Sequence, residues 1–160
     1  MSRVLLLSCV LLLLLGARAG ADELAARLRA EIVSMALDQL GVPYGRGSTD
    51  PHRGLDCSGF VRSIYQQAGL ELPRASAAQY AFTQPIDPQQ VSRGDLVFFD
   101  IRSRSRARVN HVGIYLGAGY FAHASPSRGI IVDHLSEPYY QQRFVAIRRH
   151  PDLGPAAAGP

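Results

Sequence analysis

One cysteine of this chain has neighbours that suit nucleophilic chemistry. Cys57 lies in the string Leu-Asp-Cys-Ser-Gly-Phe at the start of a helical pattern, and the other cysteine, Cys9, lies in an apolar leader. A cysteine attacks as its thiolate, and the N-terminus of a helix offers unpaired N–H groups and the positive end of the helix dipole to that charge. The backbone N–H of the same residue is also placed to stabilise an oxyanion. We therefore interpret Cys57 as a working thiol rather than an inert buried residue.

Five histidines are candidates for the general base that such a thiol needs, namely His52, His111, His123, His134 and His150. His52 lies in a Gly- and Pro-rich loop and His150 at the start of the C-terminal tail, so we expect neither to be held rigidly. His134 ends a predicted strand beside a leucine, which is typical of a surface residue. His111 and His123 lie on neighbouring predicted strands, and a register that places position 111 opposite 123 or 125 puts both imidazoles on one sheet face. One ring is then placed to hold the other in the productive tautomer.

The same two histidines are also compatible with a structural pair or a metal site. Zinc is disfavoured because the sequence offers no third or fourth ligand at a suitable spacing. We therefore expect a site that uses no metal and no cofactor.

The periodicity of apolar residues places helices in the first half of the chain and strands in the second. Helical spacing extends over 22–40 and 57–68, and a short third helix is expected from Ser76 onward. The segment between the first two helices, 42–55, is rich in glycine and proline and reads as a loop. The strand-like segments are 95–101, 111–116, 120–124, 130–134 and 143–149. Helices followed by a meander of strands indicate an α+β domain rather than a parallel βαβ fold.

The N-terminal residues carry an export signal. Residues 1–19 have the features of a cleavable signal peptide, with Arg3 before an apolar stretch and Ala-Arg-Ala at the expected cleavage site. The apolar stretch is too short to span a bilayer, and no lipid-attachment motif is evident. We therefore expect one domain over 22–150, periplasmic or secreted, followed by a disordered tail over 151–160.

The charge of the chain argues against one class of partner. All 17 basic residues are arginines, and removal of the leader leaves 15 of them against 13 acidic residues, a net charge near +2. Such a weak excess does not indicate a nucleic-acid partner.

These motifs together resemble the NlpC-type cell-wall cysteine peptidases. The resemblance covers 32–149 and rests on Asp-Cys-Ser-Gly-Phe at 56–60, Leu-Pro-Arg at 72–74, Gly-Asp-Leu-Val-Phe-Phe at 94–99, His-Val-Gly-Ile-Tyr-Leu-Gly at 111–117 and Phe-Ala-His-Ala-Ser at 121–125. The chain looks most like the Gram-negative murein endopeptidases that open peptide cross-links. The resemblance implies a papain-like fold, with N-terminal helices packed on an antiparallel sheet. It also implies that Cys57 is the nucleophile, His111 the base and His123 the residue that orients His111.

The resemblance further suggests substrate-binding residues. Tyr44 matches a tyrosine near the sulfur, Asp56 and Ser58 match positions that line subsites, and Arg74 supports the cleft. For Asp56 a helix N-cap is an equal alternative, and for Arg74 an exposed surface arginine is an alternative. One departure is clear, because the family usually continues Pro-Tyr with a tryptophan and two glycines where Gly-Arg-Gly-Ser stands at 45–48.

A run of alternating arginines precedes the first motif histidine, at Arg102, Arg104, Arg106 and Arg108. Such a run is typical of a solvated loop between two strands. Attraction to anionic wall polymers or lipid headgroups is the functional alternative.

The expected activity is hydrolysis of amide bonds in peptidoglycan stem peptides through a cysteine thioester, at the cross-link between D-alanine and a diamino acid. Three alternatives stay open: cleavage between D-glutamate and the diamino acid within one stem, a non-catalytic wall-binding module, and an acyltransferase. We expect a monomer whose partner is the peptidoglycan substrate. A periplasmic regulator or adaptor is left open.

Overall fold

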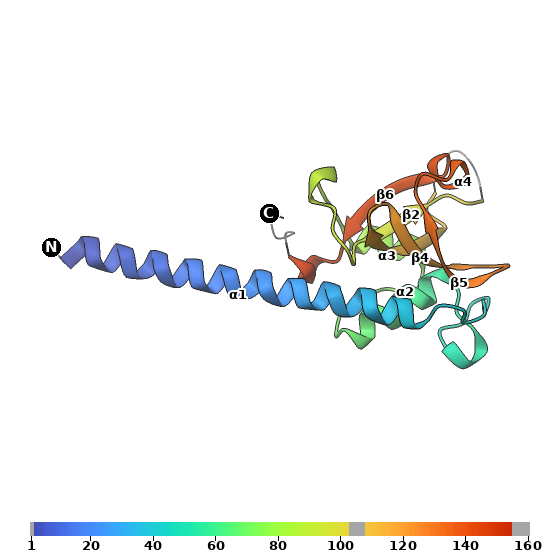
Figure 1. The fold of residues 1–160 in the computed structure, drawn as a ribbon, viewed down its shortest axis with the longest axis horizontal. Helices are drawn as coiled ribbons and strands as arrows, with labels where there is room; N and C mark the ends of the chain where they lie inside the picture. Colours follow the sequence, from blue (N-terminus) through green and yellow to red (C-terminus); the bar gives the residue numbers. More distant parts are fainter. Residues whose placement is uncertain (1, 103–107, 155–160) are drawn as a thin grey trace.

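The computed structural model describes residues 2–102 and 108–154, with side chains described from residue 19 onward in those ranges. The helices are α1 (Ser2–Asp38), α2 (Cys57–Gln67), α3 (Ser76–Phe82) and α4 (Pro138–Gln141), with 3-10 turns η1 (Pro51–Arg53), η2 (Pro88–Gln90) and η3 (Pro151–Leu153). The strands are β1 (Gln84–Pro85), β2 (Leu96–Phe99), β3 (His111–Gly117), β4 (Tyr120–Ser125), β5 (Gly129–His134) and β6 (Phe144–Arg149). The expected α+β order, helices first and a strand meander second, is confirmed (Figure 1).

The six strands form one antiparallel sheet in the order β1-β6-β2-β3-β4-β5. All four residues of the central strand β2 are buried. Because alternate side chains point to opposite sides of a strand, β2 contributes to a core on each face of the sheet. Leu96 and Phe98 belong to the core between the sheet and the helices, and Val97 and Phe99 belong to a smaller core on the other face. The sheet therefore has helices α1 and α2 on one side and the short α4 segment on the other (Figure 1).

Helix α2 packs its apolar stripe against the middle of the sheet. Phe60, Val61, Ile64 and Tyr65 follow helical spacing and are fully buried in the same cluster as β3 and β4 residues. The helix ends before Gly69, whose φ of +77° is left-handed and favours glycine, as the sequence predicts. This packing holds the first residue of α2, Cys57, close to Val112 of the interior strand β3.

A buried ion network ties α1 to the sheet. Asp95, fully buried at the start of β2, accepts hydrogen bonds from Arg29 of α1 (3.0 Å) and from Arg149 of β6 (2.8 Å to each oxygen). The same arginines also donate to the carbonyls of Leu153 and Gln90. Two buried guanidiniums share one carboxylate, so its removal leaves both without a counter-charge.

Two short elements were not expected from the sequence. β1 contains a proline and has only two residues, so it carries no strand periodicity, yet it pairs with β6 at the sheet edge. The single-turn α4 starts at a proline and is too short to show a helical period.

The expectations for the start of the C-terminal tail are wrong. His150 is 1% exposed, its Nε2 donates to the Glu71 carbonyl (3.0 Å), and its Nδ1 accepts the N–H of Asp152. The following residues, Pro151–Leu153, form η3, and Leu153 is fully buried. A capped turn and one buried leucine are enough to order this stretch, whereas 155–160 lie outside the described residues. The domain boundaries as a whole stay a prediction.

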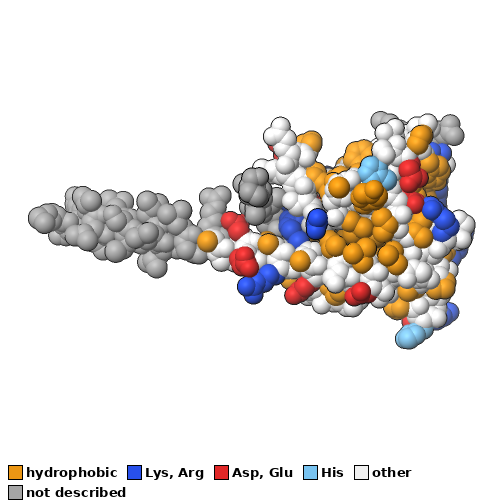
Figure 2. Space-filling view, viewed as in Figure 1, with side chains coloured by type: hydrophobic (Ala, Val, Ile, Leu, Met, Phe, Trp, Pro, Cys, Tyr) orange, Lys and Arg blue, Asp and Glu red, His pale blue; other side chains and the backbone are white. Residues whose placement is uncertain are grey.

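The expected leader forms the first part of α1, which extends away from the rest of the molecule (Figure 1). Side chains of residues 1–18 lie outside the described part, so cleavage after residue 19 stays a prediction. Within the part whose side chains are described, no helix combines the length and the hydropathy that a membrane span requires. On the globular part, Figure 2 shows hydrophobic side chains among the surface atoms of one face. Among the described residues, the large hydrophobic side chains that are exposed include Leu37 and Phe82.

Replacing Asp95 is expected to destabilise the fold strongly. Asp95→Ala leaves two buried guanidiniums unpaired, which costs about 3–5 kcal/mol in the free energy of unfolding. The matched control is Glu23→Ala, which breaks an exposed pair with Arg27 (3.1 Å) and costs no more than about 0.5 kcal/mol. Urea titration followed by circular dichroism measures both values. Equal losses in the two variants would contradict the role given to this network.

Candidate active site

Asp56 sets the start of α2 and so the position of the cysteine. Its backbone is extended (φ −83°, ψ 172°), and its Oδ1 accepts the N–H of Gly59 at 2.7 Å, which makes it the N-cap. Cys57 is therefore the first residue of the helix and is partly buried. The N-cap alternative for Asp56 is confirmed, and its binding of substrate stays a prediction.

The residues beside the cysteine form one polar network. Arg74 donates to both oxygens of Asp56 (3.0 and 2.5 Å) and to Ser58 Oγ (2.9 Å), and that hydroxyl lies 3.3 Å from Asp56 Oδ1. Burial raises the pKa of Asp56, but the hydrogen bonds from Arg74, Gly59 and Ser58 outweigh it and hold the pKa below its ordinary value. Three of the four expected substrate-binding residues thus contact one another next to Cys57.

Close approach of the preceding loop explains the glycine of this motif. A Cβ on Gly59 would lie 2.3 Å from the carbonyl oxygen of Ser48, a distance that no side chain tolerates. The same carbonyl accepts the N–H of Asp56 at 3.3 Å. The loop before α2 is therefore pressed against its first turn, which places Tyr44 and Arg46 on the wall around Cys57.

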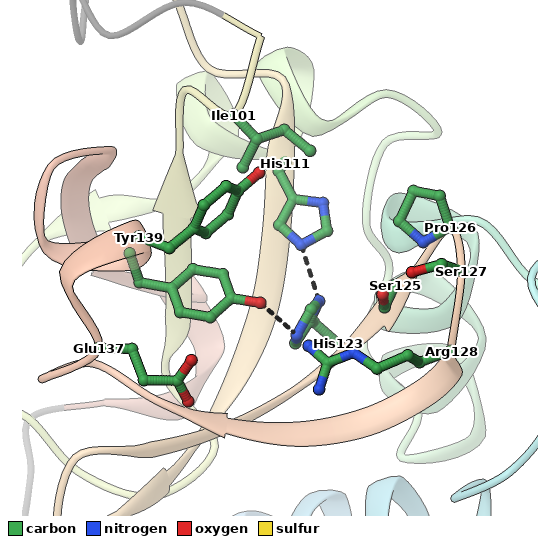
Figure 3. Close-up of a pocket in the computed structure, with 10 residues that line it drawn as sticks. Ile101, His111, His123, Ser125, Pro126, Ser127, Arg128, Glu137 and Tyr139 are labelled. Atoms are coloured by element: carbon green, nitrogen blue, oxygen red, sulfur yellow. Dashed lines mark hydrogen bonds between the residues drawn. The ribbon is translucent and has the colours of Figure 1, made fainter.

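The two motif histidines lie on neighbouring strands and contact each other. Ile114 pairs with Ala122 across β3 and β4, and this register, continued, places Ser125 opposite His111. His111 Nε2 and His123 Nδ1 are 2.9 Å apart (Figure 3), so the expected shared face is confirmed. Gly113 lets β4 lie close to β3, because a Cβ there would lie 2.7 Å from the carbonyl oxygen of Ala122 and 3.1 Å from His123 Cβ.

Beyond the two histidines the hydrogen bonds continue to a residue that the sequence analysis missed, Asp133 of β5. Its Oδ2 is 3.0 Å from His123 Nε2 and also accepts the hydroxyl of Tyr140, while Arg128 donates to both carboxylate oxygens (3.1 and 2.6 Å). The sequence did contain a signal for this residue, because an acid that directly follows the apolar run Gly-Ile-Ile-Val is expected to be partly buried and to need a partner. Burial raises the pKa of Asp133, but bonds from Arg128, Tyr140 and His123 hold it below its ordinary value.

This chain of bonds fixes the tautomer of the base. Because Asp133 is ionised, His123 donates its Nε2–H to that carboxylate and presents Nδ1 as an acceptor. His111 must then donate its Nε2–H to His123, which leaves His111 Nδ1 without a proton. An unprotonated Nδ1 is the group that a general base needs.

Burial keeps both the thiol and the imidazole neutral. Burial, with a contribution from His123, lowers the pKa of His111 to about 3, against the opposing effect of Asp133. Burial and the charge of Asp56 raise the pKa of Cys57 above its ordinary value, although backbone N–H groups, including that of Val112, favour the thiolate. The helix N-terminus therefore favours the thiolate, as expected, but the loss of hydration has the larger effect. Near neutral pH the thiol and the imidazole are therefore both uncharged at rest, and the two side chains line the same cavity.

Two adjoining cavities meet at the base. The first, of about 410 Å³, is lined by six of the seven expected site residues, Tyr44, Asp56, Cys57, Ser58, Arg74 and His111. The second, of about 340 Å³, is lined by His111 and His123 and by Arg128, Glu137 and Tyr139 (Figure 3). Ile101, His111 and Pro126 border both. A ligand that crosses His111 therefore has room on either side.

The other histidines lie away from this pair. His52 is exposed in η1, and His134 bonds the turn carbonyl of Ala118 and the hydroxyl of Ser136. Over the described residues, no group of three or more His, Cys, Asp or Glu side chains has an arrangement that would hold a metal ion. Most of the arginine run, 103–107, lies outside the described residues.

Comparison with known proteins gives consistent matches. The sequence pattern of the NlpC/P60 family matches residues 41–149. Gamma-DL-glutamyl hydrolase of Bacillus subtilis is 38% identical over 85% of this chain and 32% of its own length. Murein DD-endopeptidase MepS/Murein LD-carboxypeptidase of Escherichia coli is 39% identical over 76% of this chain and 63% of its own length. The chain thus spans less than two thirds of either relative.

A solved structure agrees with these matches. An NLP/P60 family protein from Staphylococcus aureus, described as similar to lipoprotein, superposes with a TM-score of 0.69 at 35% identity. The superposition covers 78% of this chain and 41% of that protein. The similarity therefore extends over most of the fold described above.

Alkylation of Cys57 should report the neutral resting pair. Because burial raises the thiol pKa, the thiolate fraction and the rate with iodoacetamide should rise about tenfold per pH unit from pH 5 to pH 8. No inflection is expected near pH 6.5, because burial lowers the His111 pKa to about 3. Mass spectrometry measures the rate, and Cys57→Ser corrects for Cys9. A rate that is constant from pH 5 upward would instead indicate a thiolate–imidazolium pair.

Loss of the Asp133 charge should slow catalysis without loss of binding. In Asp133→Asn the amide can donate to His123 and favour the wrong tautomer, so we expect kcat to fall on the order of 100-fold with little change in KM. His111→Ala should lose as much as removal of the thiol. Asp152→Asn, at a side chain 77% exposed, is the control and should match the wild type. Equal kcat in the Asp133 and Asp152 variants would exclude the positioning role.

Proposed function

Because the chain belongs to the NlpC/P60 family, we propose that it is a cysteine endopeptidase acting on peptidoglycan stem peptides. The observation that carries this proposal is the hydrogen-bonded series His111–His123–Asp133, which ends at the cavity of Cys57. A binding module has no need for a base whose tautomer is fixed by two further residues. The intact series therefore favours catalysis over the wall-binding alternative.

The proposed cycle begins from the neutral pair. As the Cys57 sulfur attacks the amide carbon, its proton passes to His111 Nδ1, and the oxyanion receives hydrogen bonds from backbone N–H groups at the start of α2. The His111 imidazolium is stabilised through His123 by the charge of Asp133. It then protonates the departing amine and leaves a thioester. His111 next takes a proton from water, whose attack releases the acid and returns the proton to sulfur.

The two cavities suggest how a peptide lies. The thiol lines only the first cavity, and His111 lines both. The acyl part of the substrate therefore occupies the cavity of Cys57, and the residue that carries the amine extends into the cavity of Arg128 and Glu137. Space on both sides suits a peptide that continues in both directions, as a cross-link does. Our first candidate is the bond between D-alanine and the diamino acid.

A second candidate bond is supported by one relative. The Bacillus subtilis protein named gamma-DL-glutamyl hydrolase is 38% identical to this chain. That name refers to a γ-glutamyl bond between D and L residues, and we propose the bond between D-glutamate and the diamino acid of a single stem as the corresponding one here. An acyltransferase would use the same residues but would need to keep water from the thioester, and both cavities are open at the surface.

The proposed substrate also indicates where the enzyme acts. We propose that residues 1–19 direct export and that the domain over 22–150 acts in the periplasm or outside the cell as a monomer. Peptidoglycan is the proposed partner, without a metal or a cofactor.

Digestion of purified cross-linked sacculi tests this function. Wild-type protein should convert dimeric muropeptides to monomers, identified by liquid chromatography and mass spectrometry. Cys57→Ala and Cys57→Ser should both lose this activity, with far-ultraviolet circular dichroism unchanged, because neither supplies a thiol. Release of fragments cut after D-glutamate, with dimers left intact, would select the single-stem bond. Wild-type turnover in either variant would exclude nucleophilic catalysis by this residue.

A further inference from the structure

Two arginines in the cavity of Cys57 lack a counter-charge in the described part of the chain. Arg46, in the loop before α2, and Arg102, just after β2, are exposed and line that cavity. Neither guanidinium forms an ion pair with a described residue, whereas Arg74, on the same wall, is held by both oxygens of Asp56. Two cations are thus available to a ligand.

The charged side chains that line the cavity of Cys57 include three arginines, Arg46, Arg74 and Arg102, and one carboxylate, Asp56. Asp56 caps α2 and binds Arg74, and that pair is neutral as a unit. Asp50, which lines the neighbouring cavity with Arg46, keeps its charge but does not line the cavity of Cys57. The cavity of Cys57 therefore carries a surplus of positive charge, and an anionic ligand would be drawn to it.

The two guanidiniums also act on a group inside the cavity. Burial, Cys57 and Asp56 raise the pKa of the Tyr44 hydroxyl, and the charges of Arg46 and Arg102 oppose that rise. Both cations therefore lie within electrostatic reach of the same phenol, from two different segments of the chain. A group that binds beside Tyr44 meets positive charge from both segments.

We propose that Arg46 and Arg102 together bind a free carboxylate on the acyl side of the scissile amide, which makes the enzyme selective for stem peptides whose acidic residues are not amidated. The inference rests on the proposed function and names its substrate class. A planar guanidinium presents paired N–H donors that match the two oxygens of a carboxylate. A carboxamide offers one acceptor and no charge, so it forfeits most of this attraction.

The carboxylate that the arginines meet belongs to the acyl part of the substrate. In the single-stem bond D-glutamate itself supplies the scissile carbonyl, and in the cross-link D-glutamate lies two residues before the D-alanine that supplies it. In both cases the α-carboxylate of D-glutamate is outside the peptide linkage to the diamino acid. Fixing that group near Tyr44 would orient the acyl chain and bring its carbonyl carbon toward Cys57. Arg46 and Arg102 would then determine specificity, and Cys57 and His111 would carry out the reaction.

A matched pair of substrates tests the inference. Synthetic cross-linked stem peptides would carry the D-glutamate and diamino acid carboxylates either free or as carboxamides, and kcat/KM would be measured for each. We expect the wild type to prefer the free carboxylates about tenfold, mainly through KM, since charge-assisted bonds at exposed sites are moderate in strength. The preference should shrink as salt is raised.

Variants assign the preference to the two residues. Arg46→Gln and Arg102→Gln should each reduce the preference about threefold, and the double variant should bring it close to one. Arg53→Gln is the control, because Arg53 lies in the same loop and shares a cavity with Arg46 but does not line the cavity of Cys57. It removes one positive charge and should leave the preference unchanged.

The outcomes separate this inference from the function itself. Equal cleavage of both substrates by the wild type would overturn the carboxylate site and leave the peptidase in place. An Arg53 variant that loses as much preference as the Arg46 variant would also overturn it, by assigning the effect to overall charge. Cleavage of neither substrate, with sacculi also resistant, would instead reject the proposed function.

Discussion

The hydrogen bond between the rings of His111 and His123 is the constraint on which the rest of the site depends. The two imidazoles are buried and their nitrogens are 2.9 Å apart, so they cannot both be charged. Which nitrogen carries a proton is therefore decided by the group that the second nitrogen of His123 faces. That group is the carboxylate of Asp133, which accepts the Nε2–H of His123. The register of the antiparallel strands β3, β4 and β5 brings the three side chains together. Gly113 allows the close approach of β4, which carries His123. The sheet thus fixes the direction of both hydrogen bonds, from His111 to His123 and from His123 to Asp133, and leaves His111 Nδ1 free to accept a proton.

The start of α2 determines the position of the thiol, because Cys57 is the first residue of the helix. Asp56 caps α2 and at the same time binds Arg74, so the start of the helix and the wall of the cavity are held by one carboxylate. Such dual use explains why a capping role and a role in the substrate cavity are compatible for one residue. Replacement of Asp56 would disturb both, and its kinetic effect alone could not be assigned to substrate contact.

The sequence predicted what local periodicity and spacing determine. The helices over 22–40 and 57–68, five of the six strands and the contact between His111 and His123 all depend on patterns within short segments. Asp133 was missed because its partner, His123, is not directly opposite it: His123 pairs with Ile131 across β4 and β5. Sequence spacing alone does not show that two such diagonal side chains are in contact. His150 and η3 were misjudged because their order depends on burial against distant residues such as Glu71. The raised pKa of the Cys57 thiol likewise depends on the packed core, because its main cause is desolvation.

A neutral resting pair also has a consequence for a lone cysteine in the oxidising compartment that we propose for this enzyme. Oxidants and disulfides react with the thiolate, so a thiol whose pKa is raised by burial is protected while no substrate is bound. A standing thiolate–imidazolium pair would lack this protection. In the proposed cycle the anion forms only as sulfur attacks the amide, because His111 Nδ1 accepts the proton in the same step. The surroundings that make Cys57 a weak acid thus preserve it, and the orientation of His111 makes that weak acid sufficient for catalysis.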